Sequence, residues 1–233
     1  RVRRTQEAIK SAGGLVPEKT DVYLAEELFH GRVETRLKAF EHAYVKPLIK
    51  AIKDLGLTVA QVEEYLYARH APERNAQIAK INPEFREDDT PGSGMTNEQA
   101  HAIIERFDEA GLTGGLEEVA RHVDELNVER LRVIEDAGLE TPETLQAWRD
   151  AYQYYVPLKT VTDGERPRTG KGFDIRGKES RRALGRKTAA KGLLAHTVVQ
   201  AEATIVRAEK NRVGERFLNL ARRYPNRDLW QID

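Results

Sequence analysis

Apolar residues recur at steps of three or four from Asp21 to Leu55, which is the spacing of one helical face. That face comprises Val22, Ala25, Phe29, Val33, Leu37, Phe40, Tyr44, Leu48, Ile52 and Leu55. Asp21 can cap the start of this helix, and Gly56 suits the left-handed residue that often follows a helix. Pro47 lies inside the pattern, so we expect a kink there, because proline lacks a backbone N–H and clashes with the preceding turn.

Capping signals mark the helices that follow. Thr58 with Gln61 forms a capping box that opens a second helix, which we expect Pro72 to break or bend before a further helical stretch ends near Ile81. The remaining signals predict a loop over 86–94, a helix from the Thr96 and Gln99 capping box to about Ala110, a helix from Leu116 to Ala137, and one capped by Thr141 with Pro142 at its first position.

The helical pattern disappears from Pro157 to Gly177 and returns in a long stretch from about Glu179 to Tyr224. We therefore predict an all-α fold, an irregular bundle with long first and last helices and an extended basic loop. The expected parts are an N-terminal linker (1–20), a helical bundle (21–156), the basic loop (157–178), and a C-terminal helix that packs back on the bundle (179–233).

Composition excludes some classes of protein. No apolar run approaches the length of a membrane span, so we expect no membrane span in this segment. The absence of cysteine excludes disulfides, thiolate zinc sites and cysteine nucleophiles. The chain starts without methionine and contains only Met95, so we expect an internal piece of a longer polypeptide.

Charge is balanced overall but unevenly distributed. Residues 84–143 carry seventeen acidic and five basic side chains, whereas residues 166–191 carry ten basic and two acidic ones. The basic stretch predicts a contact with nucleic acid, with a partner protein, or with the acidic helices of the chain itself, and we favour the last. The candidate contact residues are Arg166, Arg168, Lys171, Arg176, Lys178, Arg181, Arg182, Arg186 and Lys187.

Polar side chains gather around Pro72. His70 and Glu73 could act as a general acid–base pair, with Arg69 and Arg74 holding an anion beside them. The pattern indicates neither a pocket nor a nucleophile, so we interpret Arg69, His70, Glu73 and Arg74 as a structural corner between two helices. The nearby Tyr152, Tyr154 and Tyr155, before Pro157, predict a helix end docked on a neighbour.

Two Glu-x-x-His motifs, Glu27 with His30 and Glu98 with His101, have the spacing that di-iron carboxylate proteins use on a helix bundle. Six histidines in a glutamate-rich chain also produce such pairs by chance. We therefore assign no metal, no cofactor and no catalytic residue. The short Gly92-Ser93-Gly94 run lacks the length of a phosphate-binding loop.

Five segments occur in an order that resembles a known family. They are YLYARHAPERN (65–75), GSGMTNEQA (92–100), AWRDAYQYYVPLK (147–159), GFDIRGKESRRALGR (172–186) and RAEKNRVGERFL (207–218). Together they resemble the helical segment of the large polyvalent proteins of phages and conjugative elements, the PLxRFG-type domains. The resemblance extends from about Tyr23 to Trp230, although PLKTVT stands where the family's name-giving motif is expected.

The resemblance implies a structural and assembly segment of a very long, phage-encoded internal virion (ejection) protein. It implies location inside the particle, delivery with DNA, and later residence in the host cytoplasm or envelope. The expected partners are other virion proteins such as portal or core proteins, further copies of the chain in a homo-oligomer, and DNA. The alternatives are a nucleic-acid-binding helical module using Arg166–Lys191, and a carboxylate/His enzyme.

Overall fold

The computed structural model describes residues 2–86, 90–159, 173 and 185–225. Regular structure in these ranges is helical, apart from one isolated antiparallel bridge between Arg86 and Thr90. The predicted all-α class is confirmed. The α-helices are α1 (Val2–Ser11), α2 (Val22–Phe40), α3 (Lys46–Asp54), α4 (Val59–Ile81), α5 (Asn97–Glu109), α6 (Thr113–Asp136), α7 (Pro142–Ala151) and α8 (Leu193–Arg223).

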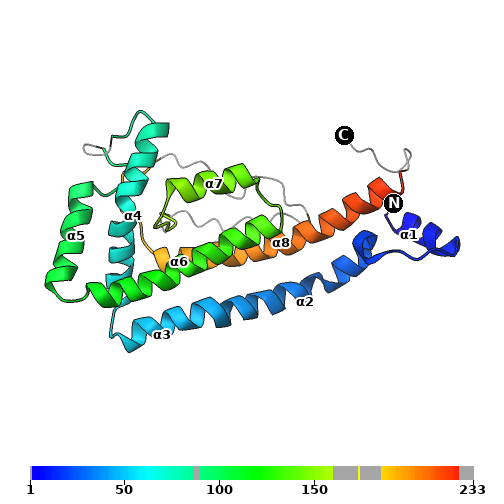
Figure 1. Cartoon of the computed structure of the whole chain (residues 1–233), viewed down its shortest axis with the longest axis horizontal. Coiled ribbons are helices and arrows are strands. Elements are labelled where there is room, and N and C mark those ends of the chain that lie inside the picture. The colour runs from blue at the N-terminus through cyan, green and yellow to red at the C-terminus, as the bar shows by residue number, and fades with distance from the viewer. Residues whose placement is uncertain (1, 87–89, 160–172, 174–184, 226–233) are drawn as a thin grey trace.

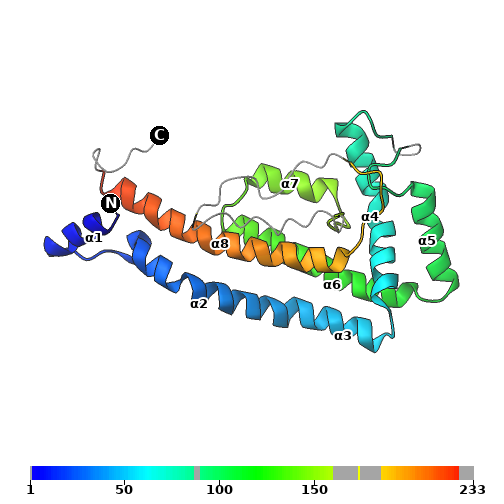
Figure 2. The same cartoon turned by 180° about the vertical axis from the view of Figure 1, so that it is seen from behind.

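The molecule is elongated (Figures 1 and 2). Helices α2 and α3 form one long arm that runs beside α6 and α8, and α2 packs along α8. Helices α4 and α5 pack together across one end of this body, while α1 lies at the other end (Figure 1). Helix α7 leads from α6 to a non-helical segment, Tyr152–Leu158, which we call the strap.

The first arm forms as its periodicity predicts. The Asp21 side chain accepts a hydrogen bond from the Leu24 backbone N–H, which caps α2. A π-helical turn, η2 (Glu41–Val45), joins α2 to α3, and the Lys46 N–H bonds to the Glu41 carbonyl. Pro47 follows in the first turn of α3. The wider turn shifts the hydrogen-bond ladder immediately before the proline, so the expected distortion takes the form of a π turn.

Buried apolar side chains form three core regions. The largest lies among α3, α4, α5 and α6, with Leu66, Leu116 and Val123 fully buried. A second lies between α2, α6 and α8, and a third holds the far end of α2 against α8. Helix α8 buries Ala201, Ile205, Ala208 and Leu220 against these regions, whereas Phe217 is exposed.

Three predicted boundaries are wrong. Residues 2–11 form a helix rather than a linker, and the buried Gln6 side chain donates to Asp21. The last helix begins at Leu193 rather than Glu179, since the described residues 185–192 are non-helical and Gly192 is left-handed. Helix α6 begins at Thr113, three residues early, with Gly114 and Gly115 in its first turn.

Helix α4 runs unbroken through Pro72, so the predicted break there is wrong. Proline removes one backbone hydrogen bond, but the helix buries residues on both sides, including Ala68, Ala71 and Ile78. Burial of this face outweighs the missing bond. The cluster Arg69, His70, Glu73 and Arg74 is therefore not the corner of a helical hairpin; it lies midway along one continuous helix.

Candidate functional site

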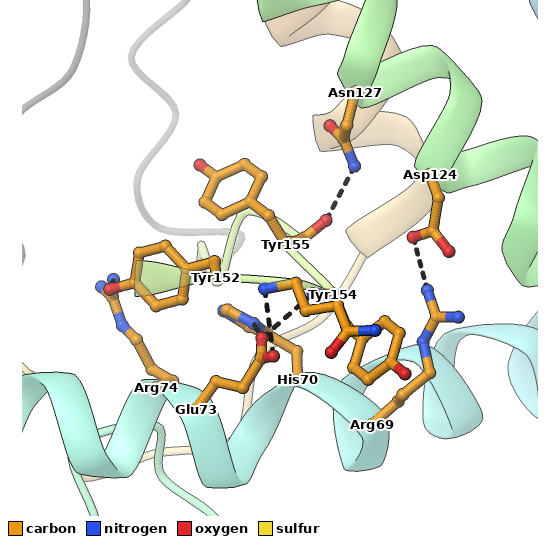
Figure 3. Close-up of polar contacts among 10 residues, drawn as sticks. Arg69, His70, Glu73, Arg74, Asp124, Asn127, Tyr152, Tyr154 and Tyr155 are labelled. Atoms are coloured by element: carbon orange, nitrogen blue, oxygen red, sulfur yellow. Dashed lines mark hydrogen bonds and ion pairs between the residues drawn. The ribbon is translucent and has the colours of Figure 1, made fainter. Parts of the chain in front are cut away.

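The polar cluster on α4 faces the strap. Arg69, His70, Glu73 and Arg74 are within six residues of one another, so consecutive helical turns present them to the same neighbourhood. Figure 3 shows them beneath Tyr152, Tyr154 and Tyr155, with α6 on the far side. The predicted docking of this tyrosine segment on a neighbouring element is what the structure shows.

Glu73 holds the strap by its backbone. One carboxylate oxygen accepts the Gln153 N–H and the other accepts the Tyr154 N–H, each at 3.0 Å (Figure 3). Burial raises the pKa of Glu73, but the His70 ring and these two amides outweigh burial and hold it below the ordinary 4.5. An ionised carboxylate that receives two amides is a strong acceptor, and Glu73 therefore anchors the strap to α4.

The two arginines bind side chains around the same segment. Arg74 donates to the Tyr152 hydroxyl at 2.9 Å. Arg69 donates to Asp124 of α6 at 2.6 Å, and its guanidinium lies 4.3 Å from the centre of the Tyr154 ring. Burial raises the pKa of Asp124 above 3.8, although the ion pair with Arg69 opposes that rise. Both arginines thus contact neighbouring elements of the chain.

His70 lies at the centre of the cluster and is 0% exposed. Its ring lies 5.2 Å from that of Tyr152 and 5.8 Å from that of Tyr155, measured between centroids. Neither ring nitrogen has a hydrogen-bond partner in the part of the chain that the structure describes. Burial lowers the pKa of His70 below 6.5, Arg74 and Arg69 lower it further, and Glu73 opposes them.

The strap also contacts α6 and α8. Asn127 of α6 donates to the Tyr155 carbonyl at 2.7 Å, and the Tyr155 hydroxyl donates to Gln200 of α8 at 3.3 Å. Val156 is 1% exposed and packs in the largest core region. The strap therefore ties α4, α6 and α8 together.

Asn75 organises the Gly92-Ser93-Gly94 run on the other side of α4. Its buried side chain accepts the Ser93 N–H and donates to the carbonyl of Met95 and to Asn97. The run approaches its neighbours closely: a Cβ at Gly92 would lie 2.3 Å from Ile78, and one at Gly94, where φ is +87°, would lie 2.4 Å from the Thr188 carbonyl oxygen. These glycines serve close packing, which explains a Gly-Ser-Gly sequence without a phosphate ligand.

A second carboxylate of α4 anchors the start of α8. Glu63 accepts the Gly192 N–H at 3.2 Å and the Leu194 N–H at 3.1 Å. These two bonds satisfy backbone N–H groups at the start of α8, where the helix dipole favours a negative charge. Helix α4 thus uses Glu63 and Glu73 to hold the two non-helical segments that flank residues 160–184.

The geometry does not suit an acid–base pair that works on a substrate. His70 Nδ1 and the nearest Glu73 oxygen are 3.7 Å apart, His70 is inaccessible to solvent, and Glu73 already receives two amides. A groove of about 690 Å³ lies alongside, between α4, α5 and α6, with Arg69, Asp124 and Tyr154 among its lining residues. The ion pair of Arg69 and Asp124 lines this groove, but His70 does not.

The two Glu-x-x-His motifs lie on α2 and α5. Within the described ranges, no group of three or more His, Cys, Asp or Glu side chains is arranged to hold a metal ion. Among the helices of the described chain, none has both the length and the apolar character needed to cross a membrane.

Most of the predicted basic contact residues lie outside the described residues: Arg166, Arg168, Lys171, Arg176, Lys178, Arg181 and Arg182. Of the other two, Lys187 is exposed. The Arg186 side chain donates from Nε to the Thr188 carbonyl of its own segment at 2.5 Å. Its backbone N–H donates to the Gly92 carbonyl at 2.9 Å and so joins this segment to the Gly92-Ser93-Gly94 run. Pairing of the basic stretch with the acidic helices stays a prediction.

No protein-family model, no curated protein and no solved structure matches the chain. The resemblance to large polyvalent proteins accordingly stays a prediction.

Sequence reasoning missed several residues of the site. Asp124 and Asn127 are three apart on α6, and both face α4 or the strap. Glu63 lies one turn below Tyr67 on α4. The signal in the sequence is weak. Asp124 and Asn127 each follow a buried apolar residue of α6, Val123 and Leu126, but polar residues next to buried ones occur wherever a helix face meets solvent.

Proposed function

We propose that this chain is a structural and assembly segment of a large phage-encoded internal virion protein, carried in the particle and delivered with DNA. The observation that carries the structural role is the use of the cluster on α4. Glu73 receives two strap amides, and Arg69 and Arg74 bind Asp124 and Tyr152. The charged side chains of the cluster thereby fix the strap and α6 against α4.

The shape supports the same proposal. The long arm of α2 and α3 beside α6 and α8 offers extended lateral surfaces, and such surfaces suit contact with neighbouring proteins in an assembly (Figure 2). The virion setting rests on the five segments that resemble the large polyvalent proteins. Three of these segments, 65–75, 92–100 and 147–159, converge on α4 through Asn75, Glu73 and Arg74.

The test is peptide mass spectrometry on purified particles of the virus or element that encodes the chain. We expect tryptic peptides from both α2 and α8 in amounts comparable to known virion proteins. Infected or donor cells, analysed in parallel, serve as the control for expression. Peptides present in the cells but absent from particles would contradict the proposal.

That negative result would favour the nucleic-acid-binding alternative, which has its own test. Binding of duplex DNA should then weaken steeply with added salt, because phosphate contacts release counterions. Neutralising Arg181, Arg182, Arg186 and Lys187 should abolish the binding. Binding that ignores salt and these substitutions would refute this alternative as well.

A further inference from the structure

His70 is a buried titratable side chain whose environment suits only the neutral ring. It is 0% exposed and lies against the rings of Tyr152 and Tyr155. A buried neutral imidazole without hydrogen bonds costs some free energy, but a buried imidazolium costs far more unless an opposite charge or water compensates it. The carboxylate that could supply the charge, Glu73, has an oxygen 3.7 Å from His70 Nδ1.

The other charged groups around His70 do not favour its protonation. Arg69 and Arg74 lie next to it along α4 and repel a positive ring. Asp124, facing from α6, is paired with Arg69 at 2.6 Å. The strap, residues 152–158, contributes the rings of Tyr152 and Tyr155 and carries no Asp, Glu, Lys, Arg or His side chain. Glu73 is therefore the one attractive charge described at this position, and it already holds the strap.

Protonation can be accommodated in two ways, and both loosen the strap. Glu73 can turn toward the ring, which removes its oxygens from the Gln153 and Tyr154 amides at 3.0 Å. Otherwise the strap lifts, so that water reaches the ring. In each case a bound proton and a closed strap exclude one another.

We propose that His70 is an acid sensor that releases the strap of residues 152–158 from α4 when it takes up a proton. Release uncovers the tyrosine side chains and frees Arg74 from Tyr152. This inference rests on the contacts of the cluster and holds whether or not the chain belongs to a virion.

The direction of the effect follows from linkage. With the strap closed, burial lowers the pKa of His70 below 6.5, and release lets water reach the ring, so its pKa then rises toward this ordinary value. The closed strap therefore has its full stability above pH 6.5 and loses stability as pH falls below that value. The pKa of Glu73 lies below 4.5, so Glu73 stays ionised between pH 7.5 and 5.5. For an open-state pKa of 6.5, the ratio of released to closed strap rises about tenfold across this interval.

Hydrogen exchange measured by NMR on the whole 233-residue chain tests this proposal. The readout is the protection factor of the Gln153 and Tyr154 amides at pH 7.5 and 5.5, corrected for the intrinsic pH dependence of exchange. We expect about a tenfold fall in the wild type and no comparable fall in His70→Leu, which keeps an apolar side chain of similar volume. The exposed His42→Gln is the matched control, and it should behave like the wild type.

Two results would overturn the proposal. One is an equal fall in the wild type and in His70→Leu. The other is identical protection of the strap amides and of Ile205 in α8 at both pH values, because the strap would then open only when the whole protein unfolds. If His70→Leu does not fold, an NMR titration of the wild-type His70 ring decides. A pKa below 6.5 supports the sensor, whereas a pKa of 6.5 or above with the strap amides still protected refutes it.

Discussion

Replacement of Glu73 by glutamine tests how the strap is held. The wild-type carboxylate accepts two amides at 3.0 Å, and its side chain is 23% exposed. Glutamine offers one oxygen, so one amide loses its acceptor and meets an NH₂ group instead. A hydrogen bond to a charged group contributes about 1.5–3 kcal/mol, and partial exposure favours the lower part of this range. We expect the free energy of unfolding to fall by about 2 kcal/mol.

For a chain of this size, about 2 kcal/mol corresponds to a Tm lower by about 4–8 °C. Thermal and urea denaturation at pH 7.5, followed by circular dichroism at a helical wavelength, measure both quantities. Glu105→Gln makes the same chemical change at an exposed position of α5 and is the matched control. It should change the free energy of unfolding by less than about 0.5 kcal/mol.

The pH dependence gives a second check on Glu73. Its pKa in the folded state is below 4.5, so its ionised form contributes stability that is complete above pH 4.5. This contribution is lost as pH falls through the folded-state pKa. The stability gap between wild type and Glu73→Gln should therefore shrink as pH falls below 4.5, because the wild-type carboxylate then loses its charge. A Glu73→Gln protein as stable as Glu105→Gln, or a gap that does not shrink, would refute the anchoring role.

Three further changes test the packing around α4 and α8. Asn75→Ala should lower the free energy of unfolding in urea by about 2–3 kcal/mol, because the Ser93 N–H and the Met95 carbonyl each lose a hydrogen-bond partner. A loss below about 1 kcal/mol would argue against that network. Gly94→Ala should lower the free energy of unfolding by about 2 kcal/mol or more, because the new Cβ would lie 2.4 Å from the Thr188 carbonyl oxygen. Gly111 has a similar left-handed φ, but none of the described residues comes within 4 Å of its Cβ position, so Gly111→Ala should cost only the backbone strain of a left-handed alanine. Arg36→Met should destabilise by about 2–3 kcal/mol, because the buried carboxylate of Glu209 then keeps only the longer contact with Arg212 at 3.8 Å. Adding Glu209→Met should recover most of that loss, and equal Tm values for the single and double variants would contradict this.

Local signals in the sequence predicted most helix boundaries correctly. Asp21, Thr58, Thr96 and Thr141 each cap the helix that was expected from them, since a capping bond joins residues three apart and needs no tertiary contact. The failures lie where long-range packing competes with a local rule. Pro72 breaks isolated helices, but the burial of the α4 face keeps this one continuous.

The candidate site shows the same division. The grouping of Arg69, His70, Glu73 and Arg74 was visible as a pattern, and so were the tyrosines of the strap. Their pairing was not, because Glu73 and Gln153 are 80 residues apart and the bond is to a backbone amide that any residue carries. The sequence also suggested a hairpin corner, and that interpretation failed together with the predicted break.

The all-α class, the caps and the left-handed Gly56 after α3 were predictable from sequence, because they depend on the spacing of side chains and on backbone conformations within a few residues. The continuity of α4, the anchoring of two separate segments by Glu63 and Glu73, and the burial of His70 beneath the strap follow from long-range packing. Burial and hydrogen-bond partners depend on which surfaces meet. That choice is made by the packing of the whole chain, and no short stretch of it carries the information.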